Sequence, residues 1–252
     1  MAIALVQSVK KVVTGVNNTT LAYTSNLTAG NLALAAHAHF LSDSITTPTD
    51  TLAQTWVGAV AEQGGVEAVR LRSFYVENCS GGADTVTFDM NGVGTGDLTV
   101  VLAEFSGAVT TTALGVTASG TGTTTTGATS GSTGTLDQAD GMLWGAIMHD
   151  GADTTITQVD GATLVQENEG GSANMPIGTS DELTTATTAQ SAIWDFGASR
   201  TYFAHVAFFK AAAAGGRTTK NTRAWPLGTV IGMGWRQECG GADMWHAAGA
   251  AA

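Results

Sequence analysis

A chain of 252 residues, 43% of them hydrophobic, is long enough to bury a substantial core without disulfide or metal staples. Charged residues make up only 12%, against roughly 25% in an average soluble domain, and glycine and threonine replace them. The net charge of −11 disfavours nucleic-acid phosphates and anionic membranes as partners. The composition argues against an architecture of long helices and favours β-structure.

The opening segment MAIALVQSVKK places its lysines after the apolar stretch, which is the reverse of a secretory signal. No apolar run approaches transmembrane length. Cys79 and Cys239 lie too far apart in sequence to suggest a disulfide framework or a zinc site. We therefore expect two unpaired, buried thiols and synthesis in a reducing cytoplasm.

Apolar and polar residues alternate with a period of two along much of the chain, which predicts β-strands. Leu32–Phe40 places His37 and His39 together on one face, opposite an apolar face. Leu98–Phe105 is a continuous apolar run, typical of a central strand. The other strands that the alternation predicts are Val69–Glu77, Thr85–Met90, Met142–Met148, Ile156–Val159, Thr163–Glu167, Ser191–Asp195 and Tyr202–Phe209.

Two segments are harder to assign from their sequence. Val109–Thr135 consists almost entirely of Thr, Gly, Ser and Ala. We expect one or two Thr-rich strands joined by Gly turns, the alternative being a flexible or glycosylated stalk. Asp181–Ala189 is the one candidate for a helix. With glycine-containing turn signals between about ten short strands, the sequence predicts an all-β, jelly-roll-like β-sandwich over residues 1–210.

The remaining residues, 211–252, form a mostly irregular extension in this interpretation. It contains Trp225, Trp235 and Trp245, half of the six tryptophans, and its four basic residues outnumber two acidic ones. A disordered tail should be poor in aromatic residues, so these side chains are expected to bury against a surface. We predict a docking strap with the three tryptophans as anchors and basic side chains at its rim. The rim residues are Arg217, Lys220 and Arg223.

Several elements of the first 210 residues resemble a β-sandwich module that recurs in phage virion structural proteins and in bacterial secreted proteins. They include a turn that ends in Gly-Asn-Leu, a Trp-containing strand and a Glu-aromatic-Ser-Gly signature. The matching residues are Leu27–Leu32, Asp50, Thr55–Trp56, Ser73–Asn78, Val101–Gly107 and Leu114–Ser119. The resemblance implies a module displayed on a large assembly, and it brings no catalytic residues with it.

Three sets of residues are candidates for chemistry. Glu104 interrupts an apolar strand, where a carboxylate is costly unless paired; we expect it to accept backbone hydrogen bonds at the Phe105–Gly107 junction, and catalysis would need a second carboxylate. His37 and His39 have metal-ligand spacing, with His149, His205 or an Asp as third ligand, but an exposed or interfacial strand face explains the pair without metal. Asp150, Asp153 and Asp160 are a weak Ca²⁺ candidate, since Asp-Gly pairs usually form turns.

The sequence is therefore interpreted as a non-enzymatic virion structural protein of a tailed phage, without a cofactor. We expect a capsid decoration (cement) protein that is made in the host cytoplasm, forms a homo-oligomer, most simply a trimer, and binds the major capsid protein. The alternatives are a carbohydrate-binding or adhesion module, with a glycan as ligand, and, behind it, a glycan-active hydrolase.

Overall fold

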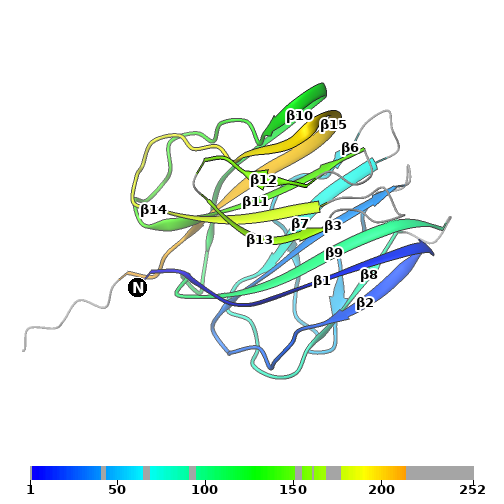
Figure 1. The fold of residues 1–252 in the computed structure, drawn as a ribbon. Coiled ribbons are helices and arrows are strands. Elements are labelled where there is room, and N and C mark those ends of the chain that lie inside the picture. Colours follow the sequence, from blue (N-terminus) through cyan, green and yellow to red (C-terminus); the bar gives the residue numbers. More distant parts are fainter. Residues whose placement is uncertain are drawn as a thin grey trace, which may run out of the picture. The chain divides into compact units, whose positions relative to one another are not determined.

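The computed structural model describes residues 2–40, 44–64, 69–90, 95–150, 155–160, 162–168 and 177–213. Throughout this part of the chain the only regular element is the β-strand, and the strands pair antiparallel (Figure 1). The all-β prediction is confirmed. Predicted and observed bounds agree closely where the alternation is strong, as in β3 (Leu32–Phe40) and β7 (Val69–Val76).

The strands form three sheets. The middle sheet has the order β1-β9-β3-β7-β5, with β6 also paired to β7. Its remaining strands are β1 (Ala4–Val16), β9 (Gly96–Ser106), β5 (Val57–Gly58) and β6 (Gln63–Gly64). The small sheet has the order β2-β8-β4, comprising β2 (Asn18–Ala22), β8 (Thr85–Asp89) and β4 (Thr49–Asp50).

The third sheet, here called the outer sheet, has the order β10-β15-β11-β14-β13, with β12 also paired to β15. Its strands are β10 (Leu114–Thr129), β11 (Gly141–His149), β12 (Thr157–Gln158), β13 (Thr163–Asn168), β14 (Ile177–Thr184) and β15 (Ile193–Lys210). The Thr-rich segment is thus a single long strand, β10. The predicted helix at Asp181–Ala189 is wrong, because β14 extends to Thr184 and no helix follows it.

Two apolar cores lie between the sheets, and a third lies on the far face of the outer sheet. The first core lies between the middle and outer sheets and includes Leu34, Phe105, Trp144 and Phe209. The second core lies between the middle and small sheets, around Phe74 and Phe88, and the third covers the far face of the outer sheet. The central strands β3 and β9 of the middle sheet are consequently buried on both faces, which explains why β3 is buried from Leu32 to His39.

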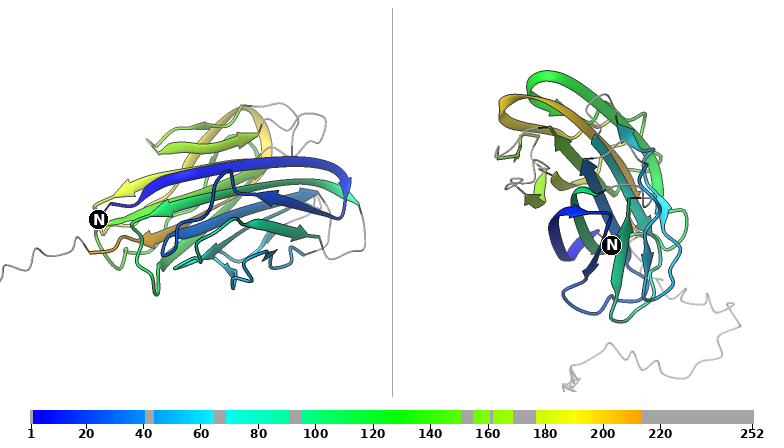
Figure 2. Two further views of the ribbon diagram at one scale, coloured as in Figure 1. Left: turned by 90° about the horizontal axis from the view of Figure 1, so that it is seen from below. Right: turned by 90° about the vertical axis from the view of Figure 1, so that its right-hand side faces the viewer.

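The third core is covered by a part of the outer sheet that bends back over its own far face. β10 and β15 pair along nearly their whole lengths, from Leu114↔Phe209 to Thr129↔Ile193. Register shifts between Gly122 and Gly127 bend this two-stranded ribbon, and the strands curl together (Figure 2). The far half of the ribbon brings Trp194 and Phe196 into the third core. What the sequence suggested as two strands, Ser191–Asp195 and Tyr202–Phe209, is therefore one bent strand.

Candidate functional site

The most elaborate group of polar side chains surrounds Glu104, on the face of β9 that points into the second core. The Glu104 side chain has no exposed surface. One carboxylate oxygen accepts hydrogen bonds from the Thr28 backbone N–H (2.8 Å) and the Asn31 side-chain amide (2.7 Å). The other accepts from the Gln7 amide at 2.6 Å. A buried carboxylate is stable in this setting because each oxygen has a donor.

These partners correct the expectation for Glu104. The carboxylate does accept a backbone hydrogen bond, but from Thr28 in the turn before β3 and not from the Phe105–Gly107 junction. Gln7 also links β1 to the segment after β2, because its side-chain amide oxygen accepts hydrogen bonds from the Thr24 hydroxyl and the Ser25 backbone N–H. Glu104 therefore links the turn around Thr28 to β9 and β1 of the middle sheet.

A second carboxylate cluster, which no sequence motif indicates, joins the small sheet to the segment before β5. The Gln54 amide nitrogen donates to Asp50 at 3.1 Å and to Asp84 at 3.3 Å. Asp50 also accepts from the indole of Trp56 at 2.7 Å, and Asp84 accepts from the Thr51 hydroxyl at 3.0 Å. Burial raises the pKa of Asp84, and the nearby charge of Asp50 adds to this effect.

Tyr23 and Cys79 lie near both carboxylate clusters. Burial, followed by the charge of Asp84, raises the pKa of the Tyr23 hydroxyl well above its usual value. Burial also raises the pKa of the Cys79 thiol to about 11, with Glu104 as the next cause, and the thiol contacts the Thr28 carbonyl at 3.3 Å. A thiol that stays protonated at neutral pH is a poor nucleophile. Its possible partner in sequence, Cys239, lies outside the described residues.

The histidines that the sequence offered as metal ligands are divided among the three cores. His37 and His39 share a face, as predicted, with 3.2 Å between ring nitrogens, but this face lies against the second core and is fully buried. The expectation of an exposed or interfacial face is wrong, because the small sheet covers it. His205 faces the first core, whereas His149 packs beside Phe196 of the third. The described part of the chain brings no three His, Cys, Asp or Glu side chains together in an arrangement that could hold a metal ion.

His205 instead forms a buried hydrogen bond to Ser73, with 2.7 Å between Nε2 and the hydroxyl. The indole of Trp144 donates to the same hydroxyl at 3.2 Å, which connects the outer and middle sheets. Neither Ser73 nor His205 has exposed surface, and burial lowers the pKa of His205 to about 3. A Ser–His pair closed off in this way has no route to a substrate, so its role is to join two sheets.

The aspartates of the weak Ca²⁺ candidate do not form one site, because Asp150 and Asp160 accept hydrogen bonds in different places. Asp150 accepts a hydrogen bond from the Thr201 backbone N–H at 3.0 Å. Asp160 accepts from the Ile193 N–H at 2.6 Å and from the Gln158 amide at 2.5 Å. Asp153 lies outside the described residues. Both described carboxylates therefore hold their own segments against β15, in the manner of turn-forming aspartates.

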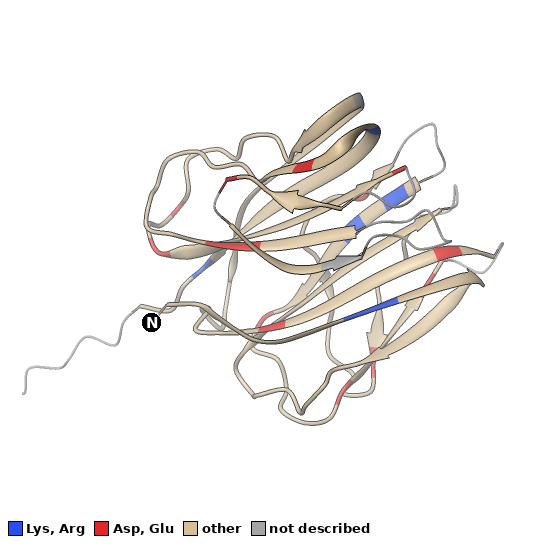
Figure 3. Ribbon diagram, viewed as in Figure 1, with Lys and Arg blue, Asp and Glu red and all other residues tan. Residues whose placement is uncertain are grey.

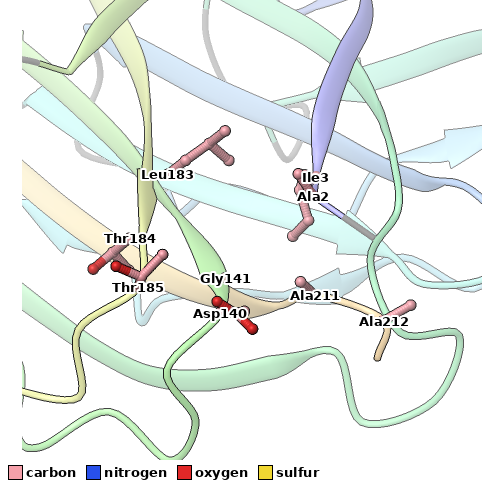
Figure 4. Close-up of a pocket in the computed structure, with 9 residues that line it drawn as sticks. All are labelled: Ala2, Ile3, Asp140, Gly141, Leu183, Thr184, Thr185, Ala211 and Ala212. Carbon is pink, nitrogen blue, oxygen red and sulfur yellow. The ribbon is translucent and has the colours of Figure 1, made fainter. Parts of the chain in front are cut away.

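Among the residues that the structure describes, two surface hollows are candidate binding sites. The first, of about 300 Å³, opens at one end of the first core (Figure 4). Apolar groups of Ile3, Leu183 and Ala211 line much of it, and Asp140 is its one carboxylate. The second, of about 330 Å³, lies beside β5 and the end of β7. Its polar lining includes Gln54, Tyr75, Glu77 and Asn78.

The residues predicted to bind a partner, Trp225, Trp235, Trp245, Arg217, Lys220 and Arg223, all lie outside the described residues. In the part of the chain that the structure describes, no helix is present that is long and apolar enough to cross a membrane. Comparison with known proteins finds no matching family model, no similar curated protein and no similar solved structure.

Proposed function

We propose that this chain is a non-enzymatic structural protein of a tailed-phage virion, most specifically a capsid decoration protein. The observation that carries the proposal is the placement of its acidic and basic side chains. Glu104, Asp84 and His205 are buried and hydrogen-bonded to side chains of other segments, namely Asn31, Thr51 and Ser73. Each of the two hollows contains one carboxylate, whereas glycoside hydrolysis requires a pair that faces the substrate.

The layered body supports this proposal on physical grounds. Three cores and long antiparallel pairings make a rigid spacer in which most backbone groups are hydrogen-bonded. The net charge of −11 keeps many crowded copies soluble. Acidic side chains are distributed over several strands and loops (Figure 3). The extension supplies the anchor in this proposal, with Trp225, Trp235 and Trp245 desolvated against the major capsid protein.

Co-sedimentation with capsids tests the proposal. Purified chain is mixed with mature capsids of candidate tailed phages, and the bound fraction is compared with that of a chain ending at Gly216. We expect the full chain to sediment with its cognate capsid and the shortened chain to stay in solution while retaining its β-sheet circular dichroism spectrum. Equal binding by both chains would contradict the anchoring role, and unfolding of the shortened chain would assign the extension to the body's own core.

A second candidate function, glycan binding, is favoured by the hollow beside β5 and β7. Tyr75 contributes a partly exposed aromatic ring there, packed edge-on against Phe209, and Gln54, Glu77 and Asn78 contribute groups that pair with sugar hydroxyls. A glycan array probed with the wild type and with Tyr75→Ala separates the two functions. Glycan binding that the substitution abolishes would favour an adhesion module.

A further inference from the structure

The middle and outer sheets have the same strand order. Taken in chain order, the main strands of the middle sheet are β1, β3, β5, β7 and β9, and those of the outer sheet are β10, β11, β13, β14 and β15. In both sheets the first strand pairs with the fifth, the fifth with the second, the second with the fourth and the fourth with the third. In Figure 1 one sheet runs from blue to blue-green and the other from green to orange. The chain thus builds the same sheet twice, once in each half of the body.

The irregularities of the two sheets repeat as well. The pairing of β1 with β9 shifts after Leu5 and again after Val13. The pairing of β10 with β15 shifts after Leu114 and again after Gly122, so each shift lies 109 residues after its counterpart. Such a shift marks a β-bulge or a similar local feature, whose position does not follow from the strand order. The coincidence of both positions therefore indicates that β1 and β10 have a common origin.

The register between the central strands is also the same. Leu32 of β3 lies opposite Phe105 of β9, and Met142 of β11 lies opposite Phe209 of β15. All four side chains enter the first core. Each phenylalanine also pairs with the residue of β1 or β10 that precedes the first register shift. Since a slip of one residue would turn every side chain to the other face, the two halves correspond residue by residue along these strands.

Each half also supplies the layer that covers the face of its sheet pointing away from the first core. In the first half this layer is the small sheet, where β8 pairs with β2 and β4. In the second half the far part of β15 pairs with the far part of β10 and with β12. Phe88 lies opposite Thr19, and Trp194 lies opposite Ala128, which is 109 residues after Thr19. These two aromatic side chains are buried in the second and third cores, which are therefore equivalent.

The sequence retains little of this correspondence, because a core conserves volume and polarity more strictly than residue identity. The Lys11 ammonium donates to the Thr20 carbonyl at 3.0 Å, whereas at the equivalent positions the backbone of Gly120 lies against the Thr129 carbonyl. The contact is kept although its chemistry differs. Identical residues at equivalent positions include Ala4 and Ala113, Leu5 and Leu114, His39 and His149, Asp50 and Asp160, Ala103 and Ala207, and Phe105 and Phe209.

We infer that the body is a tandem duplication, with a first repeat of residues 4–106 and a second repeat of residues 113–210 that pack through the same face of each sheet. The strand pairings described above all lie within one repeat, and the joining residues 107–112 lie outside the named strands. The first core is then an interface of the kind that joins the subunits of a dimer, formed within one chain. The buried hydrogen bond from the Trp144 indole to Ser73 crosses it. This inference concerns the body alone, so it is independent of the capsid-binding role proposed for the extension.

Cleavage of the full chain between the repeats tests this inference. The linker variant carries a site for a specific protease between Thr110 and Thr111, which are both exposed. The control variant carries the same site between Thr188 and Ala189, which are also exposed but lie within the second repeat. Both cleaved proteins and the uncleaved wild type are unfolded in urea, diluted into buffer and passed over a sizing column.

We expect the two fragments of the linker variant to recombine with the yield and the β-sheet circular dichroism spectrum of the uncleaved chain, because each fragment retains every strand of its sheet. The fragments of the control variant should stay apart or aggregate. In that variant β15 is separated from the chain that carries β10 and β11, so both of these strands lose their shared partner.

Exchange of fragments in the folded state provides a second measurement, which needs no unfolding step. Each cleaved protein is mixed with its own isotopically labelled form, and native mass spectrometry detects complexes that hold one labelled and one unlabelled fragment. We expect such hybrid complexes for the linker variant and none for the control variant. Recombination or exchange confined to the linker variant supports the duplication. Equal behaviour of the two variants in both measurements, or recovery of the control variant alone, overturns it.

Discussion

Glu104 is a charged side chain inside a sheet, and its three hydrogen-bond donors determine what a substitution does. In Glu104→Gln, one acceptor oxygen becomes an amide nitrogen that faces the donor of Gln7 or of Asn31. A buried donor left without an acceptor costs about 1–3 kcal/mol. We expect the free energy of unfolding in urea to fall by about that amount. Asp89→Asn, the same chemical change at an exposed position of β8, should leave it unchanged. Equal unfolding free energies for both variants would contradict the structural role of Glu104.

The buried histidines make stability depend on pH. Burial lowers the pKa of His205 to about 3, and burial together with His39 lowers that of His37 well below its usual value. Unfolded histidines titrate near pH 6.5, so below this pH the unfolded chain binds protons that the folded chain excludes. The stabilisation is complete above about pH 6.5 and is lost as the pH falls toward 3.

Urea unfolding at a series of pH values measures this effect. Each excluded proton lowers the unfolding free energy by about 1.4 kcal/mol per pH unit below 6.5. Carboxyl groups with a raised pKa, such as Asp84 and Asp181, act in the opposite direction where carboxyls titrate. We expect His205→Asn to give a shallower slope between pH 6.5 and 5 than the wild type. An unchanged slope would show that His205 takes up its proton without unfolding.

At the scale of elements, the bent ribbon of β10 and β15 depends on a glycine. A Cβ atom at Gly120 would overlap the carbonyl oxygen of Thr129, where the far part of the ribbon crosses β10. Overpacking of this kind costs roughly 1–3 kcal/mol. We expect Gly120→Ala to lower the thermal midpoint and to expose Trp194, detected by its fluorescence. Gly134→Ala, where a Cβ meets nothing within 4 Å, is the control and should behave as the wild type.

The strands themselves were largely predictable from the sequence, because alternation reports burial on one face of a sheet. The alternation in Leu32–Phe40 matches β3, but it could not show that both faces are buried, since the small sheet comes from distant segments. β14 was missed because buried polar residues such as Thr179 and Ser180 interrupt its apolar pattern. The partners of Glu104 were also beyond prediction, since Gln7 is 97 residues away in sequence.

For the whole molecule, net charge sets how association responds to salt. Two copies that each carry a charge of −11 repel across any contact, and the Debye length shortens from roughly 30 Å at 0.01 M to about 8 Å at 0.15 M ionic strength. We expect self-association of the chain to strengthen over this range, because added salt screens the repulsion between like net charges. Sedimentation velocity in the two buffers measures it. Self-association that weakens as salt is added would mean that attractive charges hold the copies together.

Gly107 lies against residues from both ends of the body. Its backbone is in the left-handed region (φ 83°), a Cβ there would overlap the Ala2 carbonyl, and its own carbonyl accepts from the Ala212 N–H at 2.8 Å. One residue thus touches both the first and the last segments of the body. The two ends of the body therefore lie close together. A short linker from Ala213 to Ala2 would leave every strand pairing in place. New termini between Thr188 and Ala189, both exposed, would give a circular permutant with the same three cores.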